Sequence, residues 1–372
     1  MKPWVSSTSK FVCNQLASWR TAVGSVRWPG GIRKTPIGVD LGVRQIKAVQ
    51  FGRSAGVWQI QAVACLPRTS TEPNISTEEV RRLRVLLSER GFRGNEVVVS
   101  VPPDRLLTGI MELPPRSSGA PIDQLAQSEL SRMHKCEPGS IEAACWPLPD
   151  PARAANTTFV MGVGCRHVDA NQLLDTLEQE NTFRVERLET QARAVARACE
   201  GLRRDVSGIA GILDVGWASA RLVLMFQDTV VYERTLARCG LGALAEPLAE
   251  KLSLKVADIE TVLSGAVRLD GRTRKGKGVK AAAGQLFATM VDEMRIPLSY
   301  LANQYPDAAM EQLCLVGGGA SLAGLADHLA ASLACEVRAV FPSDLARCPK
   351  SYDKDYGPML AAAVGLGQLD GR

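Results

Sequence analysis

Hydrophobic residues gather in short runs broken by turn residues, and one arrangement of such runs occurs twice in the chain. In residues 37–66, an apolar run ends at Asp40, Gly42 follows, and two further runs of strand-like composition complete the segment. Residues 209–237 repeat this plan around Asp214. Each copy predicts three strands with an Asp-x-Gly turn after the first, and two copies predict two similar half-domains.

Between the two copies the pattern changes to helical spacing. Ser76 and Glu79 form a capping-box pattern, and Val80, Leu83 and Leu87 follow on one face of the predicted helix. The sequence therefore predicts a helix that begins after Ser76 and stops near residue 91.

Residues 104–183 have a different pattern of apolar and polar residues, which predicts a compact α+β insertion. Its expected elements are strands at 105–113, 142–148 and 157–164, and helices at 122–133 and 168–181.

The C-terminal third is mainly helical in pattern. Residues 240–265 and 281–304 are expected to be helical, the second stretch with a kink or break at Pro297. Residues 268–280 are rich in basic residues and glycine, which favours a solvated flexible loop. The alternative is a patch for anionic lipid or for an acidic partner.

Composition is ordinary for a globular protein. The 372 residues include 46% hydrophobic and 22% charged residues, and the net charge of +5 does not call for nucleic acid as a partner. No run approaches the roughly 18 to 20 apolar residues that span a bilayer. Residues 1–35 lack the apolar core of a signal peptide and predict a basic flexible leader, with contact to a membrane surface as the alternative.

The ten cysteines contain no Cys-x-x-Cys pair, and there are only three histidines. This argues against a zinc-type site and favours buried, reduced thiols in a cytosolic protein.

The repeated plan suggests a specific chemistry. A carboxylate at each strand end, Asp40 and Asp214, can hold a hydrated Mg²⁺, and the glycine that follows each lets backbone N–H groups approach phosphate oxygens. A third stretch, residues 314–325, runs from a short apolar strand into three glycines and then a helix. Those glycines would let a flat ligand lie against the backbone at a helix start.

The order of hairpin, hairpin and glycine-rich helix start resembles the actin-like ATPase superfamily. Within it, the chain resembles the PilM family of type IV pilus assembly proteins, which is related to FtsA, over roughly residues 36–370. The resemblance implies an α/β actin-like ATPase fold with two duplicated halves around a nucleotide cleft and an inserted α+β interaction subdomain. The implied parts are the leader 1–35, a first half 36–206 with the insertion 104–183, a second half 207–351, and a closing helix 352–372 that returns to the first half.

The resemblance also implies ATP and Mg²⁺ as cofactors, with Asp40 and Asp214 on the metal side. The nucleotide-binding residues that it implies are Asp40, Gly42 and Lys47 in the first phosphate motif, Asp214 and Gly216 in the second, and Glu293, Arg295, Gly317, Gly318, Gly319 and Ala320 on the adenosine side.

Two loops depart from the family pattern. Val43, Arg44 and Gln45 stand where relatives have small or hydroxyl residues, and the bulky Trp217 follows the second Asp-x-Gly. No water-positioning group is evident, which predicts nucleotide binding with slow or absent turnover, at most a weak Mg²⁺-dependent ATPase.

The resemblance implies a cytoplasmic scaffold at the inner face of the inner membrane, in a type IV pilus or type II secretion-like machine. Its expected partner is the short cytoplasmic tail of a PilN-like inner-membrane protein, which would provide peripheral membrane association; self-association is a further expectation. One alternative is a small-molecule kinase of the same superfamily, which needs an acceptor pocket with a carboxylate base. Another is an FtsA-like anchor, although residues 368–372 do not read as a basic amphipathic helix.

Overall fold

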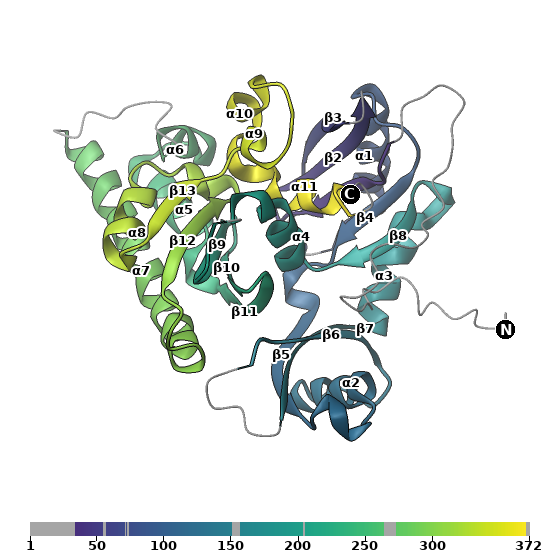
Figure 1. The fold of residues 1–372 in the computed structure, drawn as a ribbon. Coiled ribbons are helices and arrows are strands. Elements are labelled where there is room, and N and C mark those ends of the chain that lie inside the picture. The colour runs from purple at the N-terminus through teal and green to yellow at the C-terminus, as the bar shows by residue number, and fades with distance from the viewer. Residues whose placement is uncertain are drawn as a thin grey trace. The chain divides into compact units, whose positions relative to one another are not determined.

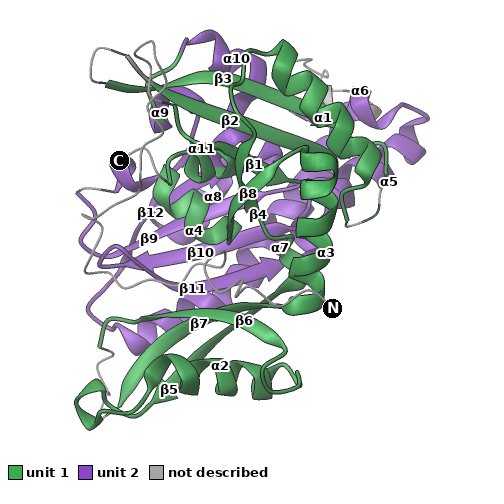
Figure 2. Cartoon of the chain, turned by 90° about the vertical axis from the view of Figure 1, so that its right-hand side faces the viewer, with its two compact units in different colours: residues 1–198, 346–348, 362–372 green, residues 199–345, 349–361 purple. Residues whose placement is uncertain are grey.

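The computed structural model describes residues 34–54, 57–70, 72, 74–150, 157–203, 205–263 and 273–369. The predicted leader, except for its last two residues, and the first part of the basic stretch at 268–280 lie outside these ranges. The chain forms two compact units (Figure 2). Unit 1 contains residues 1–198, 346–348 and 362–372, and unit 2 contains residues 199–345 and 349–361.

Unit 1 is built on a five-stranded mixed sheet in the order β3-β2-β1-β4-β8. Its first three strands are antiparallel neighbours, whereas β4 and β8 run parallel to β1, which confirms the predicted three-strand plan. The strands are β1 (Ile37–Leu41), β2 (Gln45–Ser54), β3 (Val57–Pro67), β4 (Glu96–Ser100) and β8 (Arg184–Glu189).

Three helices belong to this unit besides those of the insertion and the closing helix: α1 (Thr77–Glu89), α3 (His167–Glu178) and α4 (Gln191–Ala198). The capping box predicted at the start of α1 is present, with Ser76 and Glu79 each bonded to the other's backbone N–H. Leu83 and Leu87 of α1 and Leu177 of α3 are buried in one core with β1, β2 and β4. Helix α3 therefore shares the core of the large sheet.

The insertion is a small antiparallel sheet in the order β5-β7-β6, covered by helix α2. Its elements are β5 (Leu106–Leu113), β6 (Ile141–Pro147), β7 (Thr158–Arg166) and α2 (Ile122–Met133). Gly162 and Gly164 on β7 lie beneath Leu130 of α2: a Cβ on Gly164 would come within 3.0 Å of Leu130, and a Cβ on Gly162 would clash with Met111 of β5. These glycines let the helix pack closely on the sheet.

Unit 2 repeats the plan with a sheet in the order β11-β10-β9-β12-β13 (Figure 1). Strands β9, β10 and β11 are antiparallel neighbours, and β12 and β13 are parallel to β9, which confirms the second predicted copy. The strands are β9 (Ile209–Val215), β10 (Ala220–Phe226), β11 (Thr229–Leu236), β12 (Met310–Val316) and β13 (Glu336–Ala339).

The helices of unit 2 correct two expectations. Helix α7 (Arg274–Gln304) begins at Arg274 with Thr273 as its cap, so the end of the predicted flexible loop is helical. It also continues through Pro297, which rules out the break there and leaves the kink, the other predicted alternative, as a prediction. The other helices of this unit are α5 (Gly242–Leu252), α6 (Val256–Leu263), α8 (Leu325–Leu333), α9 (Pro342–Leu345) and α10 (Ser351–Tyr356).

The last helix, α11 (Ala361–Gly367), lies almost wholly in unit 1. Its Ala363 and Gly367 approach the backbone of Gly38 so closely that a Cβ on Gly38 would clash, and Gly365 lies equally close to Ala194 of α4. Within the described parts of the chain, no helix is both long enough and apolar enough to cross a membrane.

Candidate functional site

The first predicted carboxylate lies at the end of β1. Asp40 is 2% exposed, and its Oδ2 is 2.6 Å from Nζ of Lys47, which is the residue directly opposite on β2. The antiparallel register places the two side chains on the same face of the sheet. The structure therefore brings two of the predicted site residues together as an ion pair.

Two further residues complete what we call the Asp40 cluster: Asp40, Lys47, Ser100 and Gln191. Ser100 Oγ donates to Asp40 Oδ1 at 3.2 Å and accepts from the N–H of Leu41 at 3.1 Å. Gln191 Nε2 at the start of α4 donates to the same Oδ1 at 3.4 Å. Ser100 and Gln191 were not predicted from the sequence, although a serine at the end of β4, parallel to β1, was an available signal.

The turn after Asp40 requires a small residue. A Cβ on Gly42 would lie 2.7 Å from the carbonyl oxygen of Gln45 and 3.0 Å from Nζ of Lys47. Val43 at the tip of this turn is 43% exposed. Gly42 thus lets the turn lie close to Lys47. Val43, which stands where the family has a small or hydroxyl residue, points toward solvent.

In unit 2, Asp214 and the glycine loop (residues 317–320) lie together. Asp214 is 9% exposed at the end of β9, and Val316 is its partner on the parallel strand β12. Gly317 has φ of +83°, and a Cβ on it would clash with Oδ1 of Asp214. A side chain other than hydrogen is therefore excluded here by both conformation and space.

The rest of the glycine loop divides into a packed side and an open side. A Cβ on Gly319 would clash with Val215, and Ala320 is 4% exposed, whereas a Cβ on Gly318 would meet nothing within 4 Å. The loop thus presents the Gly318 backbone to an approaching ligand.

The second Asp-x-Gly turn is held in place by backbone hydrogen bonds. The N–H of Gly216 donates to the carbonyl of Ser219 at 3.0 Å, and the carbonyl of Trp217 accepts from the N–H of Gly242, the first residue of α5, at 2.9 Å. A Cβ on Gly242 would lie 2.9 Å from the indole ring of Trp217. Trp217 therefore lies over the start of α5.

Glu293 and Arg295, predicted for the adenosine side, are found on helix α7 in ion pairs. Glu293 is 2.5 Å from Arg238 and 3.6 Å from Arg234, and these guanidinium groups hold the pKa of Glu293 below its ordinary value. Arg295 pairs with Asp292 on its own helix at 3.4 Å, and its side chain is 73% exposed. None of these three ion pairs involves the glycine loop.

No family model matches the chain, and no curated protein matches it. Among solved structures, it is similar to the PilM-PilN type IV pilus biogenesis complex, with 21% identity over 90% of this chain and 97% of that chain and a TM-score of 0.73. It is also similar to MreB 5 of Spiroplasma citri bound to AMPPNP, with 10% identity over 90% and 95% of the two chains and a TM-score of 0.50. The chain has the PilM fold. The expected α/β actin-like ATPase fold is thereby confirmed.

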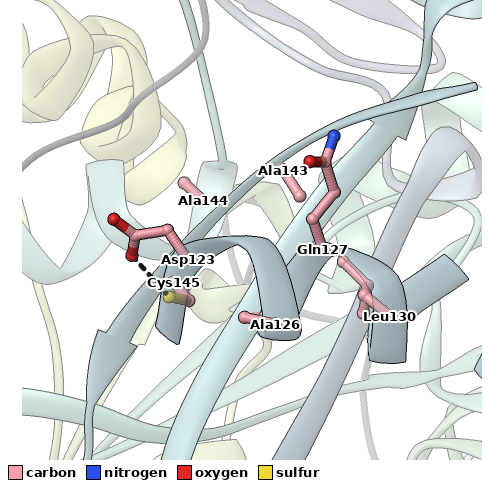
Figure 3. Close-up of a pocket in the computed structure, with 8 residues that line it drawn as sticks. Asp123, Ala126, Gln127, Leu130, Ala143, Ala144 and Cys145 are labelled. Atoms are coloured by element: carbon pink, nitrogen blue, oxygen red, sulfur yellow. Dashed lines mark hydrogen bonds between the residues drawn. The ribbon is translucent and has the colours of Figure 1, made fainter. Parts of the chain in front are cut away.

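The insertion of this PilM fold has a small hollow between α2 and β6 (Figure 3). Asp123 and Gln127 of α2 line it, and Cys145 of β6 donates from Sγ to Asp123 Oδ1 at 3.4 Å. Its volume of about 20 Å³ suits a water molecule rather than an organic substrate. The hollow is therefore no acceptor pocket for a kinase.

The residues present fit a nucleotide better than they fit a directly bound metal. The open backbone of the glycine loop is the kind of surface on which a flat ring can lie. Both oxygens of Asp40 already accept hydrogen bonds from Lys47, Ser100 and Gln191, so an ion would have to displace one of them. Nowhere in the described ranges do three or more His, Cys, Asp or Glu side chains form a cluster able to hold a metal.

Proposed function

We propose that the chain is an ATP-binding cytoplasmic scaffold of a type IV pilus or type II secretion-like assembly machine. Its partner would be the short cytoplasmic tail of a PilN-like inner-membrane protein, which would hold it at the inner face of that membrane. The similarity to the PilM-PilN complex over 90% of the chain carries this proposal.

The tail is expected to bind between the insertion and the rest of unit 1. The insertion's sheet has β5 and β6 as its edge strands, and an extended peptide can add to such an edge or lie along it. Trp146 on β6 contacts the remainder of unit 1 through Arg193 of α4, whose guanidinium lies 5.2 Å from the centre of the indole ring. A tail bound beside this contact would touch both parts of the unit.

In unit 2, nucleotide contacts are assigned to the glycine loop and Asp214: the Gly318 backbone would face the adenosine, the N–H groups after Asp214 would face phosphates, and Asp214 would meet Mg²⁺ brought by ATP. In unit 1, phosphate contacts are assigned to the N–H groups after Asp40 and to the ammonium of Lys47. In this scheme, the bound metal would supply charge neutralisation of the phosphates. Hydrolysis is slow or absent, because no residue here is assigned to position water.

A pull-down with the cytoplasmic tail of a PilN-like single-span membrane protein from the same organism tests the partner. Trp146→Ala should lower the affinity for the tail, since interface tryptophans commonly contribute 2 kcal/mol or more, which is about thirtyfold. Trp58→Ala, on the opposite edge of the large sheet, is the matched control and should bind the tail as the natural chain does.

If both tryptophan variants retain the tail equally well, the tail binds somewhere other than at the insertion. The scaffold proposal would be rejected if neither the natural chain nor the variants bound any such tail. Removing residues 104–183 is a poorer test, because Leu173 and Leu177 of α3 belong to the core of unit 1.

A further inference from the structure

The two halves share a feature besides the Asp-x-Gly turn. Seven residues after each carboxylate comes a basic residue: Lys47 after Asp40, and Arg221 after Asp214. In both hairpins the basic residue is also the direct antiparallel partner of the carboxylate. Cross-strand partners have their side chains on the same face of a sheet, so each carboxylate has a cation beside it.

The two cations differ in what they bind. Lys47 is committed to Asp40 at 2.6 Å. Arg221 is 6% exposed, and its Nε has no hydrogen-bond partner in the structure. A buried guanidinium nitrogen without an acceptor costs about 1–3 kcal/mol or more, which favours an anionic ligand at this place.

Glu233 on β11 is the acidic residue that faces Arg221. Arg221 and Glu233 are diagonal neighbours, because Glu233 pairs with Val223 and Arg221 pairs with Thr235 in the β10-β11 register. Burial raises the pKa of Glu233, and the charge of Arg221 offsets part of that increase. The Oε1 of Glu233 also lacks a hydrogen-bond partner, so it does not accept from the Nε of Arg221.

The glycine loop lies on the other side of Asp214 from Arg221. In the sheet, β9 carries Asp214 between β10, with Arg221, and β12, whose end leads into Gly317. A nucleotide laid on the glycine loop would thus have its phosphates in reach of the Arg221 side chain, which is long and planar and forms paired hydrogen bonds with phosphate oxygens.

We propose that Arg221 is a phosphate-binding residue of unit 2, the counterpart of Lys47, and that this built-in cation lets the chain hold a nucleotide without a divalent metal. The inference rests on the nucleotide binding proposed above. Mg²⁺ then adds little to the affinity, because the phosphate charge is already balanced by protein side chains.

Titration of the full chain with a fluorescent ADP analogue, in Mg²⁺ and again in EDTA, tests this. The natural chain should bind with a Kd in EDTA within about threefold of its Kd in Mg²⁺. Arg221→Gln should weaken binding in EDTA about 10- to 100-fold, as expected for the loss of a charged hydrogen bond. Arg221→Lys, which keeps the charge, should recover part of that loss.

Arg203→Gln is the matched control, because Arg203 is also buried in unit 2, at 7% exposure, and its Nε also lacks a hydrogen-bond partner, but its guanidinium is ion-paired with Asp228 and is not the cross-strand partner of Asp214. It should lower the unfolding temperature without changing the Kd. Binding in Mg²⁺ that disappears in EDTA would overturn the inference and leave nucleotide binding standing. An unchanged Kd in Arg221→Gln would also overturn it, and no binding under either condition would remove both proposals.

Discussion

Lys47 and Asp40 face each other across the β1-β2 hairpin, with Nζ 2.6 Å from Oδ2. The Asp40 side chain is 3% exposed and that of Lys47 is 16% exposed, so the pair lies almost entirely out of water. Ser100 and Gln191 bind the other oxygen of Asp40. The pair is thus part of the packing of unit 1 as well as of its proposed phosphate site.

Lys47→Met should lower the free energy of unfolding by about 3–5 kcal/mol, because it leaves the buried carboxylate of Asp40 without its counter-charge. The double variant Asp40→Asn/Lys47→Met should be more stable than Lys47→Met alone. Urea denaturation measures both, and the exposed Lys354→Met should change stability by no more than about 0.5 kcal/mol. A double variant no more stable than Lys47→Met would show that the two residues are not coupled.

Gly317→Ala should lower stability by at least about 1–3 kcal/mol, because Gly317 has φ of +83° and because the new Cβ would clash with Asp214. Gly318→Ala is the matched control one residue along the same loop. A Cβ there meets nothing within 4 Å, so its stability should stay within about 0.5 kcal/mol of the natural chain. If guanidinium denaturation gives the two variants the same stability, the described loop conformation is wrong.

Glu79 should make stability depend on pH in acid. Burial alone would raise the pKa of Glu79, but hydrogen bonds from Arg68 and from the N–H groups of Ser76 and Thr69 outweigh it and hold the pKa below the ordinary 4.5. Because the folded pKa is lowered, this stabilisation is present above pH 4.5 and is lost as the pH falls through the folded value.

Glu79→Gln should therefore cost about 3 kcal/mol at pH 7, and the difference from the natural chain should shrink steadily as the pH falls below 4.5. Unfolding curves at a series of pH values measure this. Glu78→Gln, at the exposed neighbouring position, should cost less than about 1 kcal/mol at pH 7. A constant difference between Glu79→Gln and the natural chain at all pH values would contradict the assignment.

Local patterns were enough to predict most of the elements. Asp40 and Asp214 end apolar runs and are followed by glycine, and both do lie at strand ends. The start of α7 was misjudged because glycine is a poor helix former. There, a Thr273 side chain that accepts from the N–H of Gly276 at 3.0 Å and the burial of Val279 favour the helix.

The hydrogen-bond partners of the site residues could not be predicted from local sequence patterns. Ser100 and Gln191 reach Asp40 from 60 and 151 residues away in sequence, so only the order of strands in the sheet brings them together. Arg221 was overlooked for another reason. Its spacing from Asp214 matches that of Lys47 from Asp40, but its significance depends on the register of β9 and β10 and on its burial.

Trp217 should decide how the chain distinguishes ATP from ADP. Its indole lies against Gly242 at the start of α5, directly after the turn proposed to face phosphates. We expect it to fill space that a small residue would leave to a terminal phosphate. The natural chain should therefore bind ADP and ATP with Kd values within about threefold of each other and should hydrolyse ATP very slowly. Trp217→Ala should improve ATP binding relative to ADP by about tenfold, the equivalent of about 1.4 kcal/mol.

The measurement is a competition titration of each nucleotide against the fluorescent analogue, together with a phosphate-release assay. Trp58→Ala, which changes a half-buried tryptophan of unit 1 on β3, should leave the ratio of the two Kd values unchanged. The turn itself should survive in Trp217→Ala, because the Gly216 to Ser219 and Gly242 to residue 217 hydrogen bonds are made by the backbone. A strong preference of the natural chain for ATP, or brisk hydrolysis, would mean that the indole does not restrict the terminal phosphate.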